Sequence, residues 1–344
     1  MKKNTGYLDV LRFVAIIVVV LIHTVSGVST QMPERMTVYQ LSFYNSIKNI
    51  CTIGVPLFLM ISGVLFLNPE KEVSIKDLLF KYVRRIVLAL LIFGTAYALL
   101  EIIFGTRDFK PVYLWEAFYQ MLLGNTWGHM WYLYMLIGIY LLIPLLKPFV
   151  KAATKEMYTY VLIMLFVVSS VLPFIKIMTG FAFGASIVSV QVTEFVVYIF
   201  YFLVGYYIHT YLREQIIKSS KTLIIGMIII FAEILIISIN EYTQSSIYIS
   251  YDSPIVVILA LTVFVLGCRL QGEYKLCTKL RPFLFGIYLV HTFYLNLLYK
   301  LLGVTPLECG GYILIPLFAI GVFLLSLVSV WIMRLIPPLR KYVL

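Results

Sequence analysis

Long apolar runs separated by short polar stretches dominate the chain. A helix needs about 20 mostly apolar residues to cross a hydrocarbon core of about 30 Å. Ten runs meet this length or come close to it, and they predict membrane-spanning helices over residues 8–27, 46–67, 78–104, 130–148, 157–178, 192–211, 221–239, 252–270, 281–302 and 311–335. The amphipathic stretch 105–129 predicts a short helix at the membrane surface. The pattern is that of an all-α polytopic membrane protein.

The composition of the 344-residue chain supports this fold class. Hydrophobic residues make up 62% of the chain and charged residues 12%, and the mean hydropathy is +0.97. A soluble domain usually carries about 25% charged residues, and a soluble protein with so few could not cover its apolar surface. No polar segment is long enough for a soluble second domain, so we expect residues 1–344 to form a single transmembrane domain.

The positions of lysine and arginine set the expected orientation. If the N-terminus is cytoplasmic, the inner side holds twenty of these residues and the outer side six, and Arg12 lies within the first helix. Cytoplasmic loops are enriched in Lys and Arg, and the loss of one span would invert every later loop. We therefore expect ten helices, both termini in the cytoplasm, and a multi-pass location in a cell membrane, most simply the bacterial plasma membrane.

The same distribution of charge bears on possible partners. A net charge of +11 could indicate nucleic acid, but the charges lie in short runs between apolar segments, which predicts a membrane-lipid environment and no nucleic-acid partner. The four cysteines, Cys51, Cys268, Cys277 and Cys309, lack the spacing of a metal site. We expect four free thiols, no metal and no permanently bound cofactor; the less favoured alternative is a Cys51–Cys309 disulfide.

The first predicted helix begins with Leu8-Asp9-Val10-Leu11-Arg12 and carries His23 after ten further residues; Arg12 and His23 are the informative pair. Eleven residues correspond to about 1100° of helical rotation, so the two side chains share one face about 16.5 Å apart along the axis. An arginine within a spanning segment usually faces protein or water rather than lipid. The functional interpretation is a site that runs along this face. The structural alternative is that Arg12 reaches the inner interface and His23 only mediates a helix contact.

The third predicted helix begins with a basic cluster formed by Lys81, Arg84 and Arg85. Such a cluster is typical of the positive belt at an inner membrane surface. It could also form a phosphate clamp, because the guanidinium group of arginine offers phosphate a fixed fork of donors.

Further polar and aromatic candidates lie in the later helices. Trp131 suits an interfacial aromatic belt, and His291 lies near the middle of its predicted helix, where an ionisable group is a candidate for function. The candidates are His129, Trp131, Tyr288 and His291, and three acidic residues without an assigned role are Glu101, Glu194 and Glu233.

Taken in order, these elements resemble the acyltransferase-3 family of membrane acyltransferases along essentially the whole chain. The matching motifs are Leu8-Asp9-x-x-Arg12 followed by x10-His23, Val55-Pro56-Leu57-Phe58 with Ser62-Gly63, the basic cluster, His129-x-Trp131-Tyr132-Leu133 with Ile137-Gly138-Ile139-Tyr140, and Ile287-Tyr288-Leu289-x-His291. The resemblance implies a ten-helix protein that transfers an acyl group from cytoplasmic acyl-CoA, most often acetyl-CoA, to an acceptor hydroxyl. The acceptor is usually a sugar, here a cell-surface or lipid-linked glycan, at or beyond the outer face.

The resemblance also implies roles for individual residues. It makes His23 the catalytic candidate, as a general base or as an acyl carrier, with Arg12 beside the CoA phosphates. The family often has two arginines three residues apart at the start of the third helix, whereas Arg84 and Arg85 are adjacent here. Lys81 can then share the clamp with them, or donor binding differs. His129, Trp131, Tyr288 and His291 are weaker candidates for contacts to substrate.

A transporter or exporter of a glycan or small solute is the rival interpretation. Ten helices with buried charge also suit a permease, and some members of the family have been assigned export or uptake roles. The two functions differ in whether acyl-CoA is consumed.

Overall fold

A computed structural model describes residues 5–181, 190–308 and 311–344, without the side chains of 190–194 and 311. This part of the chain is helical and contains no strand. Its α-helices are α1 (Gly6–Gln31), α2 (Val38–Cys51), α3 (Gly54–Phe66), α4 (Ile75–Asp77), α5 (Arg84–Ala89), α6 (Thr95–Thr106), α7 (Val112–Leu122), α8 (Trp131–Ala152), α9 (Lys155–Phe166), α10 (Leu172–Thr179), α11 (Val190–Tyr207), α12 (Arg213–Lys218), α13 (Lys221–Thr243), α14 (Pro254–Cys268), α15 (Lys275–Leu280), α16 (Leu284–Asn296), α17 (Ile315–Met333) and α18 (Pro337–Tyr342).

Nine helical stretches among the described residues are long and apolar enough to cross a membrane. They are Gly6–Gln31, Val38–Phe66, Ile75–Thr106, Gly128–Ala152, Lys155–Thr179, Phe195–Lys218, Lys221–Thr243, Lys275–Leu301 and Tyr312–Met333. Each corresponds to a span predicted from the sequence, which confirms the polytopic membrane fold. The remaining predicted span, 252–270, is the 15-residue helix α14, whose length of about 22 Å falls short of the hydrocarbon thickness.

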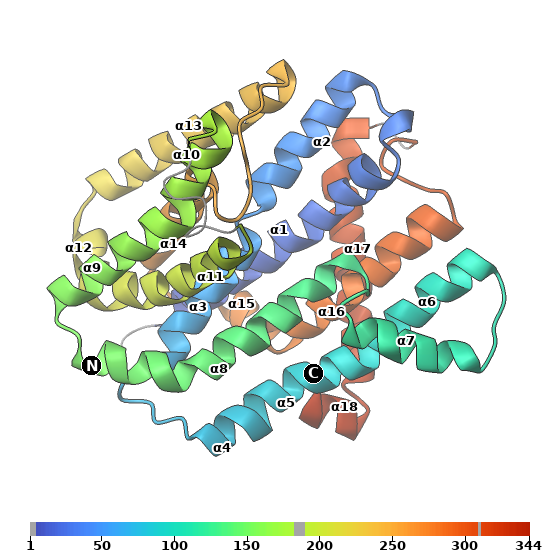
Figure 1. The fold of residues 1–344 in the computed structure, drawn as a ribbon, viewed down its shortest axis with the longest axis horizontal. Coiled ribbons are helices and arrows are strands. Elements are labelled where there is room, and N and C mark those ends of the chain that lie inside the picture. The colour runs from blue at the N-terminus through green and yellow to red at the C-terminus, as the bar shows by residue number, and fades with distance from the viewer. Residues whose placement is uncertain (1–4, 182–189, 309–310) are drawn as a thin grey trace.

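Helix α1 lies in the middle of the bundle and packs against α2, α3, α14, α16 and α17 (Figure 1). Because neighbours surround it, the polar face predicted from Arg12 and His23 meets protein. Helices α3 and α11 approach each other most closely at two glycines. A Cβ atom on Gly63 would lie 1.8 Å from the carbonyl oxygen of Phe202, and one on Gly205 would lie 2.3 Å from that of Met60. Only small residues permit such close helix contact.

The periphery of the bundle presents apolar side chains outward. Helix α13 exposes Ile224, Met227, Ile228, Phe231 and Leu235, among others. Such a surface would be unstable in water but suits a lipid environment, where the helix satisfies its own backbone hydrogen bonds. The predicted surface helix within 105–129 is present as α7, which packs along α6.

The first described residues, at the start of α1, and the last residues of the chain lie at the same end of the bundle, which we name the terminal end (Figure 1). Asp9, in the first turn of α1, contacts Arg281 just before α16, and Arg334 donates to the carbonyl oxygen of Leu344. The opposite end, named the far end, holds the last turn of α1 and the loop before α17; here Arg35 and Glu308 form an ion pair. Assignment of the terminal end to the cytoplasm stays a prediction.

Candidate functional site

Four cavities follow one another through the bundle. We name them from the terminal end the vestibule (about 1310 Å³), the arginine cavity (about 520 Å³), the narrow cavity (about 40 Å³) and the outer chamber (about 520 Å³). Neighbouring cavities share lining residues. The vestibule and the arginine cavity share Arg12, Leu65 and Arg281; the arginine and narrow cavities share Phe58, Tyr132 and Tyr288; and the narrow cavity and outer chamber share His23 and His129. The cavities therefore form a path between the two ends.

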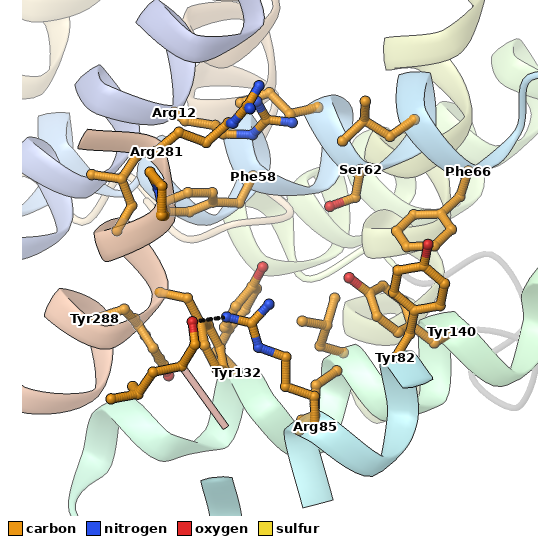
Figure 2. A pocket seen from close by; sticks show the side chains of 18 of the residues that line it. Arg12, Phe58, Ser62, Phe66, Tyr82, Arg85, Tyr132, Tyr140, Arg281 and Tyr288 are labelled. Atoms are coloured by element: carbon orange, nitrogen blue, oxygen red, sulfur yellow. Dashed lines mark hydrogen bonds between the residues drawn. The ribbon is translucent and has the colours of Figure 1, made fainter. Parts of the chain in front are cut away.

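The arginine cavity takes its name from Arg12, Arg85, Arg281 and Arg334, which all line it. Figure 2 shows Arg12 and Arg281 together on one side and Arg85 extending from the opposite helix. No Asp or Glu is among the described residues that line this cavity. Its charge therefore favours an anion, and guanidinium groups suit phosphate in particular.

Asp9 fixes the position of two of these arginines. It is 4% exposed, forms an ion pair with Arg12 one helical turn away, and lies 3.4 Å from Nη1 of Arg281. The hydroxyl of Thr278 lies 3.2 Å from the same carboxylate. One buried carboxylate thus links the start of α1 to the segment before α16. Removal of one partner from such a buried ionic group lowers the stability of the fold, because it leaves a buried charge uncompensated.

The basic cluster of the third helix divides between the cavity and the surface. Arg85 lines the cavity and donates from Nε to the carbonyl of Val343 (2.9 Å) and from Nη2 to a main-chain oxygen of Leu344, the last residue of the sequence (2.7 Å). The guanidinium group of Arg84 instead lies over the ring of Tyr342. Lys81 lies over the ring of Tyr82, and neither Lys81 nor Arg84 lines the cavity. Only one member of the predicted clamp therefore faces the path.

Three histidines converge where the narrow cavity meets the outer chamber. The ring of His23 lies 5.0 Å from that of His291 and 6.0 Å from that of His129, and the latter two rings are 5.4 Å apart. They come from α1, α16 and the turn before α8. No group of three or more His, Cys, Asp or Glu in the described ranges is arranged to hold a metal ion.

Hydrogen bonds to the backbone define the tautomer of His23. Its Nδ1 lies 2.7 Å from the carbonyl oxygen of Val19, so Nδ1 carries the proton and Nε2 is the basic nitrogen. Nδ1 of His291 donates to the carbonyl of Tyr288 (2.7 Å), which leaves its Nε2 as an acceptor. That Nε2 lies 3.2 Å from Nδ1 of His23 and shares the single proton that Nδ1 donates to Val19 at the shorter distance. No hydrogen bond from the described part of the chain engages Nε2 of His23. This nitrogen is available to take a proton from a substrate.

The other predicted contact residues surround the same junction. Trp131 lines the narrow cavity, and Tyr288 lines the narrow and arginine cavities. The hydroxyl of Tyr288 donates to the backbone carbonyl of His129, which joins α16 to the start of α8. His291 is fully buried and lines none of the four cavities; it contacts residues that do, namely His23, His129 and Tyr288.

Most of the residues that line the outer chamber have polar side chains. Glu101 accepts from Nε1 of Trp127 (2.9 Å) and from Nζ of Lys300 (2.9 Å). The ring of Trp127 stacks on that of Tyr97 at 4.2 Å, which fixes its orientation. The other polar side chains in the lining are His23, Ser26, Thr30, Gln31, Asn125, Thr126, His129, Thr292, Asn296 and Tyr299. An aromatic face beside many neutral donors and acceptors is suited to a hydroxyl-rich ligand.

Several site residues were not predicted from the sequence, namely Asp9, Ser62, Tyr82, Trp127, Tyr140, Arg281, Lys300 and Arg334. Asp9, Ser62 and Tyr140 lie in the motifs of the family resemblance, and Asp9 also precedes Arg12 by three residues, a spacing that makes the two neighbours on a helix. Glu101 has a place in the outer chamber, whereas Glu233 is buried in α13 away from the path, with one carboxylate oxygen unpaired. The side chain of Glu194 and the whole of Cys309 lie outside the described residues.

Comparison with known proteins identifies the family. A family model described as an acyltransferase domain matches residues 5–335. No curated protein and no solved structure matches the chain. The match includes α1, with Arg12 and His23, and continues through α17, so it covers all four cavities apart from Leu344. The chain belongs to the acyltransferase-3 family, and it is a membrane acyltransferase.

Proposed function

We propose that this protein transfers an acyl group from acyl-CoA, bound from the terminal end, to a hydroxyl of a sugar acceptor held at the far end. The observation that carries this proposal is the position of His23. It lies where the path from the arginine cavity meets the outer chamber, and Nε2 is its basic nitrogen. A donor and an acceptor that approach from opposite ends can meet at this side chain. The protein would then act across a cell membrane, in our proposal the bacterial plasma membrane.

The arginine cavity and the vestibule fit the donor. Acyl-CoA carries its phosphates on a bulky nucleotide and its thioester at the end of a long, thin arm. The vestibule, at about 1310 Å³, offers room for the nucleotide, and Lys71, Lys275 and Lys279 line it. Arg12, Arg85, Arg281 and Arg334 supply the cations further in. The arm would follow the cavity between Phe58, Tyr132 and Tyr288 towards His23.

The proposed reaction needs one proton acceptor. Nε2 of His23 takes the proton of the acceptor hydroxyl, and the oxygen forms a bond to the thioester carbonyl carbon. The tetrahedral intermediate collapses with cleavage of the carbon–sulfur bond. CoA leaves as a thiolate and receives the proton from His23, so the products are an ester and CoA thiol. The carbonyl of Val19 holds the imidazole of His23 in its tautomer, and His291, beside the same nitrogen, acts as a positioning residue.

A thiol-release assay tests the proposal. Purified protein in nanodiscs, given acetyl-CoA and membrane glycolipid extract, should release CoA thiol and form a hydroxylamine-labile ester. A protein that only exports a glycan would bind the extract without consuming the donor. Absence of thiol release from a folded preparation, with each acyl-CoA tried, would contradict the proposed function.

Cysteine labelling tests the orientation. Lys151 lies one helical turn beyond Lys147, whose Nζ donates to the carbonyl of Lys71 in the vestibule lining, and so it marks the terminal end. Asp108 follows α6, whose Glu101 lines the outer chamber. In a background lacking reactive native thiols, we expect a cysteine at 108 to react with an impermeant reagent in intact cells and one at 151 to be protected. The reverse pattern would place donor binding outside.

A substitution in the outer chamber tests the acceptor site. Glu101→Gln should remove the ion pair with Lys300. It should also weaken the hydrogen bond that holds the indole of Trp127 in place. We expect the KM for acceptor to rise about tenfold, as one charge-assisted contact is lost, while the KM for donor stays unchanged. Glu116→Gln is the matched control, because Glu116 is exposed on neighbouring α7 and lines none of the four cavities. An equal change in the KM for acceptor in the Glu101→Gln and Glu116→Gln proteins would contradict the assignment of the outer chamber as the acceptor site.

A further inference from the structure

The proposed reaction requires a hydrogen-bond donor for the oxygen of the thioester carbonyl. This oxygen becomes an oxyanion when the acceptor hydroxyl attacks, and enzymes usually stabilise such an oxyanion with donors that are fixed in advance. The attack takes place beside His23, which lines the narrow cavity. No lysine or arginine belongs to the described lining of that cavity. The oxyanion therefore needs a neutral donor.

Three side chains line both the arginine cavity and the narrow cavity, so a donor arm that reaches His23 passes between them. Phe58 has no hydrogen-bond donor on its side chain. The hydroxyl of Tyr288 already donates to the backbone carbonyl of His129. The hydroxyl of Tyr132, by contrast, has no hydrogen-bond partner among the described residues.

The unpaired hydroxyl of Tyr132 faces the path. Buried phenol groups usually have a hydrogen-bond partner, and Tyr132 is only 7% exposed. Its oxygen is not among the fully enclosed polar atoms that lack a partner in the described part of the chain. The oxygen is therefore open to the cavities, and it takes its partner from whatever occupies the path.

Packing holds the ring of Tyr132 in place. The rings of Tyr288, Trp131 and Phe58 lie 5.5, 6.4 and 6.5 Å from it, and Figure 2 shows its side chain among those that line the arginine cavity. A phenol ordinarily has a pKa of about 10 and so keeps its proton at neutral pH. The hydroxyl is thus a donor whose position is set before charge develops on the substrate.

We propose that Tyr132 is the oxyanion donor of the transfer reaction. This inference rests on the proposed function, because it assumes that the thioester reaches His23 from the arginine cavity. As the acceptor oxygen bonds to the carbonyl carbon, the π electron pair moves to the carbonyl oxygen, and the Tyr132 hydroxyl donates a hydrogen bond to it. The pair returns when the carbon–sulfur bond breaks, so the phenol keeps its proton throughout.

The narrow cavity has further polar side chains that provide a comparison. Thr52 and His129 have hydrogen bonds to other residues. Trp131 and Tyr251 have side-chain donors without a partner among the described residues, and their rings lie 5.3 Å apart. Neither lines the arginine cavity, so neither belongs to the boundary that the donor arm crosses. Tyr132 alone combines a free donor with a place at this boundary.

Tyr132→Phe tests the inference, because it removes the hydroxyl and keeps the ring. Loss of one oxyanion donor lowers kcat by about 10²–10³-fold, and we expect a decrease of this size in thiol release from acetyl-CoA per folded molecule. The KM for acetyl-CoA should stay nearly unchanged, because the interaction strengthens only in the transition state. The thermal unfolding midpoint should not fall, because no hydrogen bond within the protein is lost.

Tyr158→Phe is the matched control and should show the opposite pattern. Tyr158 is fully buried and lines none of the four cavities, and its hydroxyl donates to the carbonyl of Leu203 at 3.0 Å. Its substitution breaks a buried hydrogen bond, so it should lower the thermal unfolding midpoint. Its kcat per folded molecule should remain that of the wild-type protein.

The results that contradict the inference differ from those that contradict the proposed function. A normal kcat in folded Tyr132→Phe protein would overturn the oxyanion assignment, whether the KM for acetyl-CoA rises or not. A large loss of kcat in Tyr251→Phe but not in Tyr132→Phe would overturn it in favour of the other hydroxyl. Absence of thiol release from the wild-type protein would instead overturn the proposed function, and this inference with it.

Discussion

Replacement of His23 by alanine should lower acyl transfer by about 10²–10⁴-fold, the usual contribution of a general base. The loss should appear in kcat, because the imidazole takes a proton only as the acceptor hydroxyl attacks. Donor binding should persist, because the arginine cavity lies on the other side of Phe58, Tyr132 and Tyr288. The measurement is thiol release per folded molecule, with acetyl-CoA binding determined separately in nanodiscs.

Thr24→Val provides the control for this substitution. Thr24 follows His23 on α1, is fully buried and lines none of the four cavities, and within the described residues its hydroxyl bonds only to the carbonyl of Val20. We expect this variant to retain transfer. If His23→Ala protein folds and turns over at a nearly normal rate, His23 is not the base. If both variants lose folded protein to the same extent, His23 has a structural role.

Arg85→Ala should raise the KM for acyl-CoA by about 10–100-fold, the effect expected from the loss of one hydrogen-bonded charged group. Arg84→Ala should leave it unchanged. The two arginines are adjacent, but Arg85 lines the cavity whereas Arg84 lies over the ring of Tyr342. A change in KM without an equal change in kcat identifies an interaction that is formed in the ground state as well as in the transition state.

Arg85→Lys extends the test. Lysine keeps the charge but lacks the planar fork of donors, so this variant should recover only part of the lost affinity. Equal donor KM values for Arg84→Ala and Arg85→Ala would mean that the cluster serves only to orient the protein in the membrane. A larger effect of Arg84→Ala would place the donor outside the arginine cavity.

Much of the fold is predictable from hydrophobic pattern alone. A membrane requires long apolar helices, and such a signal is local and strong. The span at 252–270 shows the limit of this reasoning. Its apolar run has nearly the length that a spanning helix needs. In the structure, however, α14 begins at Pro254, after the Ser253 cap, and ends at Cys268. Cap residues and turn geometry, rather than hydropathy, decide where such a helix begins and ends.

The site was predictable only where the signal is confined to one helix. The spacing of Arg12 and His23 placed both on one face of α1, and the structure brings both to the path. Arg84 and Arg85 could not be distinguished, because the helix that holds them follows a π-helical stretch, Leu78–Val83, that changes the register of the face. Hydropathy carries no information about such a change.

Long-range contacts explain the remaining omissions. Arg281 reaches Asp9 from 272 residues away along the chain, and His291 reaches His23 from 268 residues away. His23 and His291 could be identified as ionisable residues within apolar segments and His129 as a polar residue just before one, but their convergence depends on how α1, α8 and α16 pack. No local pattern in one sequence encodes that arrangement.

Sided transfer in membrane vesicles tests the central claim most directly. Everted vesicles from the source cells, which expose the cytoplasmic face, are given acetyl-CoA labelled in the acetyl group, and right-side-out vesicles receive the same donor. The account predicts release of CoA outside everted vesicles and hydroxylamine-labile label on a glycan inside them, with neither in right-side-out vesicles or in a His23→Ala strain. Labelling of right-side-out vesicles alone, or equal labelling in the His23→Ala strain, would contradict it.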